Sequence, residues 1–375
     1  MFAYRGDTSL QALRLEIENL FGSGASVILT SSARSGLWNL FSCLPHKQVV
    51  VPAYTCGAVI EAASLAGKHV VYMDNSASNF NSDLREVSSH LNADSILVLT
   101  HQYGAPNDPR RATMLAKRVG AFVLEDCAAA LGSRSNGQLV GTLGDAAVLS
   151  FDVSKLVHAP LKGGAIITRN GLLYADCRKF QSENTRNSPV LQQLFTLLQA
   201  CMLVFIQRSV IYRIFHYLKF GLSSTFTDET VEISKEPTSL YTTRLANWQA
   251  SIVLSQIRNL DSQIEIRRSL YARYAKELSG IDGLELPPFD YCQEWAPIRY
   301  SIRVKGAKLN FYRRLNRFGV DASFSFSHLV APETYVNAHQ CANEVLNLPF
   351  YSRLSDREFR KVVDVVRKIA NAKQN

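Results

Sequence analysis

The stretch Ser150-Phe151-Asp152-Val153-Ser154-Lys155 decides how this chain is interpreted, and Gly163-Gly164 follows it closely. The apolar run at 147–149, directly before it, predicts a buried strand. A lysine just past such a strand can bond covalently to the aldehyde of a cofactor. Upstream, Asp126 follows the apolar run 121–124, and a carboxylate there can keep the ring nitrogen of pyridoxal phosphate protonated. The pair favours pyridoxal phosphate as cofactor, with Lys155 and Asp126 as catalytic residues.

Short apolar runs alternate with helix-like segments along the first half of the chain. The runs expected as strands are residues 49–51, 70–73, 96–99, 121–124, 147–149 and 165–167. This alternation predicts an α/β fold with a mostly parallel sheet. Sites in such sheets form at the carboxyl ends of the strands, where His101, Asp126 and Ser150 are expected. Several polar residues at strand ends favour a binding site over simple strand terminators.

Composition excludes several classes of protein. With 375 residues, of which 47% are hydrophobic and 19% charged, the chain is long and apolar enough for real cores rather than disorder. The seven cysteines form no CxxC pair, so neither a disulfide framework nor a zinc site is expected, and a reducing, cytoplasmic location fits. No HExxH-type spacing supports a metal site. Residues 1–10 carry charges and lack the apolar core of a signal peptide.

The net charge of +9 has several explanations. Nucleic acid binding is one, but the basic residues are dispersed and no nucleic-acid motif occurs, so no such partner is expected. An anionic small substrate or an anionic membrane surface explains the excess as well. So does a basic surface without a special purpose.

Residues 172–240 interrupt the alternation and predict a helical, amphipathic insertion. Its uncharged part, 187–207, is a poor transmembrane span because three glutamines divide it. Basic residues interleaved with apolar ones follow: Arg208, Arg213, His216 and Lys219. One hypothesis is peripheral contact of 187–219 with a membrane surface or lipid substrate. A helical hairpin packed on the body or at a subunit interface is favoured, because apolar stripes are usually core.

The C-terminal part reads as a smaller α/β unit. Residues 244–280 predict one long helix, which is followed by turn residues at 287–288. A strand is expected at 301–304, with helices at 310–318 and 356–370. The domain prediction is therefore a large cofactor-binding domain at 1–245, followed by a long linking helix and a small C-terminal domain at 246–375.

Several motifs occur in a fixed order over much of the chain. They are 30–37 (TSSARSGL), 51–56 (VPAYTC), 101–106 (HQYGAP), 125–132 (EDCAAALG), 141–145 (GTLGD), 150–155, 241–244 (YTTR) and 348–351 (LPFY). In this order they resemble the DegT/DnrJ/EryC1/StrS family of sugar aminotransferases. The resemblance covers most of the chain outside the insertion, and it implies a fold-type-I pyridoxal phosphate enzyme.

The resemblance assigns a role to each part of the site. Lys155 would carry the cofactor and move the proton, Asp126 would hold the proton on the ring nitrogen, and Ser150 would donate to the phosphate. Backbone amides at 33–34 would bind the phosphate at a helix N-terminus. The cofactor-binding residues implied are Ala33, Arg34, Tyr54, Cys56, Asp126, Ala129, Ser150, Lys155 and Thr242. Related sugar dehydratases have His at the position of Lys155, so the lysine argues for transamination.

The activity that the resemblance implies is transfer of an amino group, from glutamate, to a nucleotide-linked keto sugar. Such a reaction serves polysaccharide or secondary-metabolite synthesis. Family members work as homodimers, so a homodimer is expected. The positive net charge suits a diphosphate-bearing substrate.

The sequence departs from the family's pattern around the cofactor. The family's Gly-Thr in the first turn is Ala33-Arg34, and Arg34 could bond the phosphate or point to solvent. An aromatic residue that stacks on the ring is replaced by Cys56, so Tyr54 or another residue would cover the ring. Ala129 replaces a glutamine.

Two further positions differ: Thr242 replaces an asparagine that reaches the neighbouring subunit's phosphate, and Lys162 stands where Glu is frequent.

The departures keep two alternatives open. The first is other pyridoxal phosphate chemistry on the same fold, with a different carbonyl or amine substrate. The second is a non-catalytic binding or regulatory descendant, against which the retained Lys155 and Asp126 argue.

Overall fold

A seven-stranded sheet lies at the centre of the computed structural model, which describes all residues except 1–7, 77–79, 207–232, 288–293, 327–328 and 372–375. The strand order is β1-β9-β8-β5-β4-β2-β3. The strands are β1 (Ser26–Thr30), β2 (Gln48–Pro52), β3 (His69–Met73), β4 (Ser95–Thr100), β5 (Phe122–Asp126), β8 (Ala146–Ser150) and β9 (Gly164–Thr168). Only β9 runs against the others in this sheet. The predicted α/β fold with a mostly parallel sheet is confirmed.

All six predicted strands of this sheet are present, and each is an apolar run. The fold buries the five inner strands on both faces, whereas β3 at the edge of the sheet is mostly half-buried. The sequence analysis missed β1, a five-residue edge strand between a helix and the turn at 31–32. β1 pairs antiparallel with β9 and forms one edge of the sheet.

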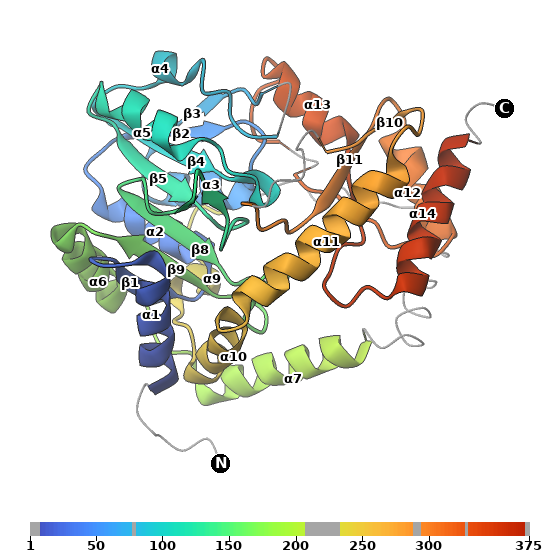
Figure 1. Cartoon of the computed structure of the whole chain (residues 1–375). Coiled ribbons are helices and arrows are strands. Elements are labelled where there is room, and N and C mark those ends of the chain that lie inside the picture. Colours follow the sequence, from blue (N-terminus) through green and yellow to red (C-terminus); the bar gives the residue numbers. More distant parts are fainter. Residues whose placement is uncertain (1–7, 77–79, 207–232, 288–293, 327–328, 372–375) are drawn as a thin grey trace.

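Helices cover both faces of the sheet (Figure 1). One face carries α1 (Thr8–Phe21), α4 (Val87–His90), α5 (Pro109–Lys117) and α10 (Asn247–Ile257). The other carries α2 (Ala33–Cys43), α3 (Gly57–Leu65) and α6 (Gly171–Asn184). Side chains alternate between the faces: in β4, Leu97 and Leu99 join the α5 side, whereas Ile96 and Val98 join the α2 side.

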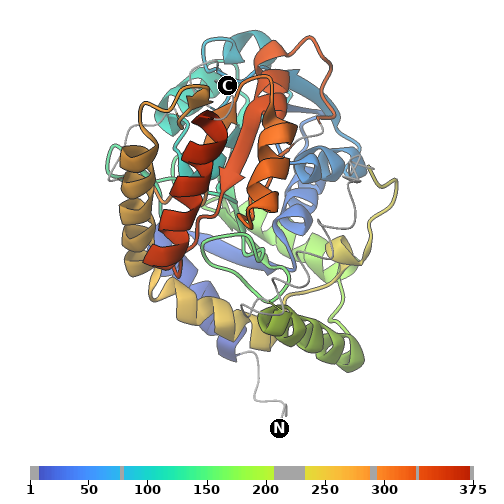
Figure 2. The same ribbon diagram turned by 90° about the vertical axis from the view of Figure 1, so that its right-hand side faces the viewer.

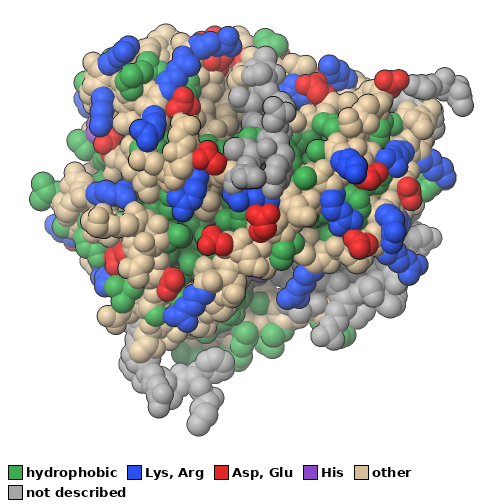
Figure 3. Space-filling view, viewed as in Figure 1, with side chains coloured by type: hydrophobic (Ala, Val, Ile, Leu, Met, Phe, Trp, Pro, Cys, Tyr) green, Lys and Arg blue, Asp and Glu red, His purple; other side chains and the backbone are tan. Residues whose placement is uncertain are grey.

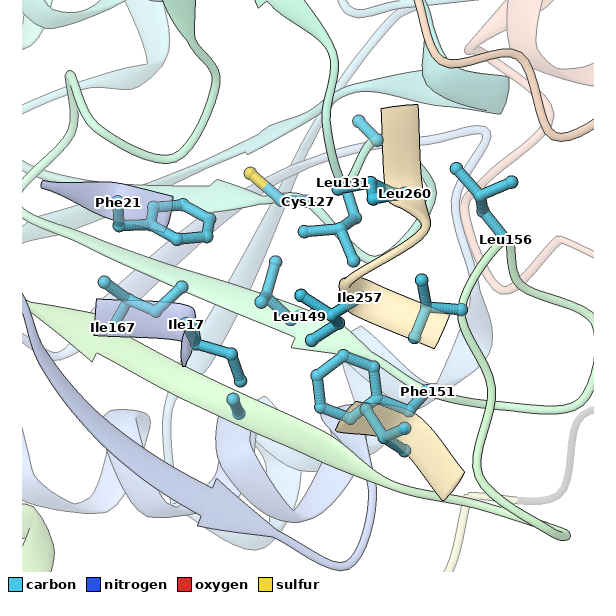
Figure 4. Packing of buried hydrophobic residues seen from close by; sticks show 14 of the residues in the cluster. Ile17, Phe21, Cys127, Leu131, Leu149, Phe151, Leu156, Ile167, Ile257 and Leu260 are labelled. Atoms are coloured by element: carbon cyan, nitrogen blue, oxygen red, sulfur yellow. The ribbon is translucent and has the colours of Figure 1, made fainter. Parts of the chain in front are cut away.

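One core cluster holds the loop that follows β8. Figure 4 shows Phe151 and Leu156 packed with Ile17 of α1 and Ile257 of α10. The Phe151 amide also donates to the Gly163 carbonyl at 2.7 Å. Phe151 and Leu156 are buried on either side of Lys155, so the lysine projects from an anchored loop.

The single long helix predicted at 244–280 is wrong, because two helices occupy this stretch. These are α10 and α11 (Leu260–Leu278), and Asn259 between them has φ −110° and ψ 18°, outside helical values. α10 packs against α1, whereas most of α11 packs in the C-terminal core, so the chain turns between two cores. The domain limit at 245/246 stays a prediction.

The C-terminal part is a three-stranded antiparallel sheet with helices. Its strands are β10 (Leu284–Glu285), β11 (Tyr300–Val304) and β12 (Val345–Leu348), and its helices are α12 (Lys308–Arg317), α13 (Val336–Glu344) and α14 (Asp356–Asn371). Figure 2 shows α12 and α14 side by side over this sheet. The predicted strand at 301–304 and the helices at 310–318 and 356–370 are confirmed.

Short elements complete the described chain: β6 (Arg134–Ser135) and β7 (Gln138–Leu139) form a hairpin, η1 (Gln102–Gly104) is a 3-10 turn, and α9 (Ser239–Thr242) is a single turn. The predicted insertion, 172–240, contains most of α6, then α7 (Val190–Ile206) and the first half of α9. The basic residues at 208, 213, 216 and 219 lie outside the described residues. No helix in the described part of the chain is long and apolar enough to cross a membrane.

Candidate active site

The carboxyl ends of β1, β8, β5, β4 and β2 meet at one edge of the sheet, because these strands run in the same direction. Asp126 is the last residue of β5 and Ser150 the last of β8. Asp126 is the register partner of Val148, two residues before Ser150. Lys155 lies in the loop after β8. The sheet therefore brings the predicted acid and the predicted lysine to the same edge.

Asp126 is a buried carboxylate, 6% exposed, whose Oδ1 accepts a hydrogen bond from the Ala128 amide at 3.0 Å. Burial raises its pKa, and the Ala128 amide and the charges of Lys155 and His101 act in the opposite direction. A buried carboxylate with few donors around it is well suited to a cationic N–H such as a protonated pyridine nitrogen.

Lys155 is a desolvated amine. Burial lowers its pKa, Cys56 and Asp126 act to raise it, and Arg299 acts to lower it further. In the described part of the chain, no carboxylate is paired with this amine within 4.0 Å. The lowered pKa increases the fraction of neutral amine, which is the form that reacts with an aldehyde.

Glu125, beside Asp126, ties the end of β5 to the loop at 141–144. Its buried carboxylate accepts hydrogen bonds from the amides of Gly141 at 2.7 Å, Leu143 at 2.8 Å and Gly144 at 2.6 Å. Burial acts to raise its pKa, but the bonds from His101 and these amides outweigh it, so the pKa is lowered. Glu125 thus anchors the GTLGD loop and stays ionised.

His101 completes this buried network. Its Nδ1 accepts from the Asn107 amide at 3.0 Å, so its Nε2 carries the hydrogen donated to Glu125 at 3.1 Å. His101, Glu125 and Cys127 place their ligand atoms within 4.8 Å of one another. Both ring nitrogens and both carboxylate oxygens already have protein partners, so the cluster acts as a scaffold and not as a metal centre.

The turn at the start of α2 fits a phosphate. Ser32 caps the helix by accepting from the Ser35 amide at 3.1 Å, and the amides of Ala33 and Arg34 have no acceptor within the helix. A Cβ added to Gly164, the first residue of β9, would lie 2.6 Å from the Ala33 nitrogen. Glycine therefore allows the sheet backbone to pack on this turn. Amides and helix dipole together favour an anion here.

Helix α9 is held against the same turn by three serine hydroxyls. Ser31 and Ser32 donate to the Leu240 carbonyl at 3.2 and 3.1 Å, and Ser35 donates to the Tyr241 carbonyl at 2.8 Å. Thr242 follows directly, and its own hydroxyl donates within α9 to Thr238 at 3.3 Å. Thr242 is thus placed next to the turn, and its contact with a phosphate stays a prediction.

The Arg34 side chain lies against α3. Its guanidinium pairs with Glu61 at 3.1 Å, and the Tyr241 hydroxyl also donates to Glu61. Burial lowers the pKa of Lys162, and the charge of Arg34 lowers it further, so the two cations are neighbours. The sequence analysis expected the Arg34 side chain either to bond the phosphate or to point to solvent. It did not anticipate the ion pair with Glu61.

The other predicted cofactor ligands have different surroundings. Tyr54 is fully buried, and its hydroxyl bonds to the Tyr103 hydroxyl at 2.7 Å and the Ser325 carbonyl at 3.1 Å. Cys56 is exposed at the start of α3, close enough to Lys155 to influence its pKa. Ala129 packs against the α1–α10 core cluster. Their contacts with a cofactor, like that of Ser150, remain predictions.

The HQYGAP motif docks the C-terminal part on the sheet. Gly104 has φ +99°, and a Cβ there would lie 2.2 Å from the Ala296 carbonyl oxygen. The Ile298 amide donates to the Tyr103 carbonyl at 3.1 Å. The Ser133 hydroxyl donates to the Gly104 carbonyl at 2.7 Å and accepts from the Ala296 amide at 2.9 Å.

This docking brings Arg299, which the sequence analysis missed, to the site. Arg299 is partly buried and lines a small pocket with Tyr103 and Trp295. Burial lowers the pKa of Arg299, and no carboxylate of the described residues forms an ion pair with it. Nothing in the sequence around position 299 marks it, because its neighbours come from another part of the chain.

The model of the DegT/DnrJ/EryC1/StrS aminotransferase family matches residues 9–367. The UDP-N-acetyl-3-dehydro-alpha-D-glucosamine 3-aminotransferase of Acidithiobacillus ferrooxidans is 24% identical, over 96% of this chain and 88% of that protein. The dTDP-3-amino-3,4,6-trideoxy-alpha-D-glucose transaminase of Micromonospora megalomicea is 26% identical, over 86% of this chain and 78% of that protein.

A solved structure has the same fold. It is ntda from Bacillus subtilis with bound cofactor pmp, with a TM-score of 0.72 and 20% identity over 97% of this chain and 77% of that chain. The family resemblance seen in the sequence is confirmed by the family match.

Proposed function

Because this chain belongs to the DegT/DnrJ/EryC1/StrS aminotransferase family, we propose that it is a pyridoxal phosphate-dependent aminotransferase acting on a nucleotide-linked keto sugar. The amino donor in this proposal is glutamate. The observation that carries it is the presence of a desolvated Lys155 and a buried Asp126 at the same carboxyl edge of the sheet, beside a helix N-terminus. The names of the two curated relatives, both sugar aminotransferases, support the substrate class.

The residues present fit the cofactor. The α2 turn would hold the phosphate through the amides of Ala33 and Arg34, with Ser150 adding a hydroxyl. Asp126 would hold a proton on the ring nitrogen, and Lys155 would carry the aldehyde carbon. When bound, pyridoxal phosphate accepts the electron pair released as the donor's C–H bond breaks.

The protein's own contribution is proton handling. Burial lowers the pKa of the Lys155 amine, and in its neutral form Nζ can accept a proton from the donor carbon and return it elsewhere. Asp126 stays close to the opposite charge of Lys155, which favours its ionised form against the effect of burial. Glu125 holds the strand end on which Asp126 stands.

Arg299 supplies the cation for the donor's carboxylate in this proposal. It is a partly exposed guanidinium that influences the pKa of Lys155, and it has no ion-pair partner among the described residues. A guanidinium binds a carboxylate through two parallel hydrogen bonds and so orients it. The carboxylate of an amino acid is bonded directly to the carbon that reacts, so a cation beside the lysine suits it.

The proposal includes the wider expectations. The enzyme would work in the cytoplasm as a homodimer, in polysaccharide or secondary-metabolite synthesis, with the division into 1–245 and 246–375. The unpaired cysteines at 43, 56, 127, 177, 201 and 341 suit a reducing compartment. Sedimentation equilibrium tests the dimer.

An absorption spectrum of the purified full-length protein with added pyridoxal phosphate tests the cofactor assignment. We expect a band from the covalently bound cofactor that Lys155→Ala abolishes. Lys68→Ala is the matched control, because burial also lowers the pKa of Lys68, which precedes β3 at the opposite edge of the sheet. The band should survive in this control, and its absence from the wild type would refute the assignment.

Turnover with a panel of nucleotide-linked keto sugars and glutamate tests the substrate class. Product formation with at least one sugar supports the proposal. A cofactor band without turnover of any sugar would instead favour the alternative that the changes at Cys56, Ala129 and Thr242 raise, which is a different carbonyl substrate.

A further inference from the structure

Helix α7 turns its apolar face outward. Its exposed large hydrophobic residues have relative exposures between 48% and 82%: Val190, Leu191, Leu194, Phe195, Leu198, Met202 and Phe205. At 100° per residue they fall within an arc of about 140°. Seven of the seventeen exposed large hydrophobics of the described chain therefore lie on one face of one helix.

The opposite side of α7 is the more covered one. Gln193, Thr196, Leu197 and Ala200 are only partly exposed, and none of the α7 side chains described is buried. The usual arrangement is seen in α14, where Phe359, Val362 and Val366 are buried. Among these four residues only Leu197 is a large hydrophobic residue, so in α7 the more exposed face is the more apolar one.

The position of α7 leaves this face open. Figure 1 places the helix along the lower margin of the molecule, beyond the sheet and its covering helices. In Figure 3 hydrophobic side chains show at the same margin. The predicted helical hairpin, packed on the body or at a subunit interface, stays a prediction.

The chain around α7 carries charge of one sign. No acidic residue occurs between Glu183 and Asp228, whereas Arg186, Arg208, Arg213 and Lys219 do. α7 itself has no charged residue. An apolar helix face within a purely basic segment is complementary to an anionic lipid surface, which offers acyl chains and negative headgroups together.

We propose that α7 is a membrane-surface helix that inserts its apolar face among anionic lipids. Its 17 residues extend about 25 Å, enough to lie along the interface. Direct pairing of α7 with α7 of a second copy is disfavoured by charge, because residues 184–227 contain basic residues and no acidic one. The proposal is independent of the catalytic reaction.

Co-sedimentation of the full-length protein with vesicles tests this inference. One set contains phosphatidylcholine alone and the other adds phosphatidylglycerol. We expect stronger binding to the anionic set, weakened by salt. Leu191→Gln should weaken binding roughly fivefold, and the triple change Leu191→Gln, Phe195→Gln, Leu198→Gln on the order of 100-fold.

Leu172→Gln is the matched control. Leu172 is 80% exposed and Leu191 is 79% exposed, but Leu172 lies at the start of α6. We expect it to bind vesicles like the wild type. Circular dichroism and sedimentation equilibrium on all variants check the fold and the subunit number.

Two results would overturn the proposal. Wild-type protein that stays in the supernatant with both vesicle sets has no lipid-binding face. A triple variant that changes from dimer to monomer while vesicle binding is unaffected would identify the face as a subunit contact.

Discussion

Replacement of Arg299 by glutamine should separate donor binding from the rest of the reaction. Hydrogen bonds to charged groups contribute about 1.5–3 kcal/mol. Since about 1.4 kcal/mol corresponds to a factor of ten, kcat/KM for glutamate should fall about 10- to 100-fold. Arg299→Lys keeps the charge and loses the two-pronged geometry, so its loss should be smaller.

Arg299→Gln should also shift the pH dependence of the rate at which Lys155 attaches the cofactor. The charge of Arg299 lowers the pKa of Lys155, so its removal raises that pKa and reduces the neutral amine at a given pH. The rising limb of the rate of cofactor attachment should therefore shift to higher pH in Arg299→Gln. Arg268→Gln should leave it in place, because Arg268 bonds to the Trp295 carbonyl and does not influence the pKa of Lys155.

Single-turnover absorption measurements provide the assay, with glutamate alone added to the pyridoxal form of the enzyme and keto sugar alone added to the pyridoxamine form. Slowing confined to the glutamate half supports a donor-carboxylate site. Slowing confined to the sugar half would assign Arg299 to the nucleotide's phosphates. Unchanged glutamate kinetics and an unchanged pH profile would refute the argument, whereas a wild type without any cofactor band would refute the proposed function itself.

Glu125→Gln should lower the free energy of unfolding by about 2–4 kcal/mol in urea melts, because it weakens charge-assisted bonds to three amides. The lowered pKa of Glu125 stabilises the fold above the ordinary glutamate pKa, and this stability is lost as pH falls through the lowered value. The variant should therefore lose less stability in acid than the wild type. Gly164→Ala should cost about 2 kcal/mol or more and weaken cofactor binding, whereas Gly171→Ala, with nothing within 4 Å, should be neutral or stabilising in the same thermal melts. Asp126→Asn removes the carboxylate that would hold the proton on the ring nitrogen, so kcat for amino transfer from glutamate should fall about 100-fold or more in steady-state turnover.

The strands and the Lys155–Asp126 pair could be predicted from the sequence for a local reason. Buried parallel strands are continuous apolar runs, and their polar ends identify the edge where sites form. The turn at Asn259 could not be predicted, because the apolar periodicity continues through it. Only the positions of two separate cores decide that the helix ends there.

Arg299 illustrates a second limit. Its importance depends on the docking of a segment more than a hundred residues beyond Lys155, and no local pattern encodes that contact. For α7, the apolar stripe was visible in the sequence, but the direction in which it points was not. Periodicity is the same for a helix whose apolar stripe faces the body and for one whose stripe faces away, so it does not decide the direction.

The docking of the C-terminal part by the Tyr103 turn has an evolutionary consequence. The contacts join the Tyr103 carbonyl to the Ile298 amide, and the Ser133 hydroxyl to the Ala296 amide. On the side of the C-terminal part both contacts use backbone amides, which are the same for almost every amino acid, so they place little demand on the side chain that follows. If Arg299 binds the donor as proposed, a single codon change at this position would alter the donor preference while the docking contacts stay in place.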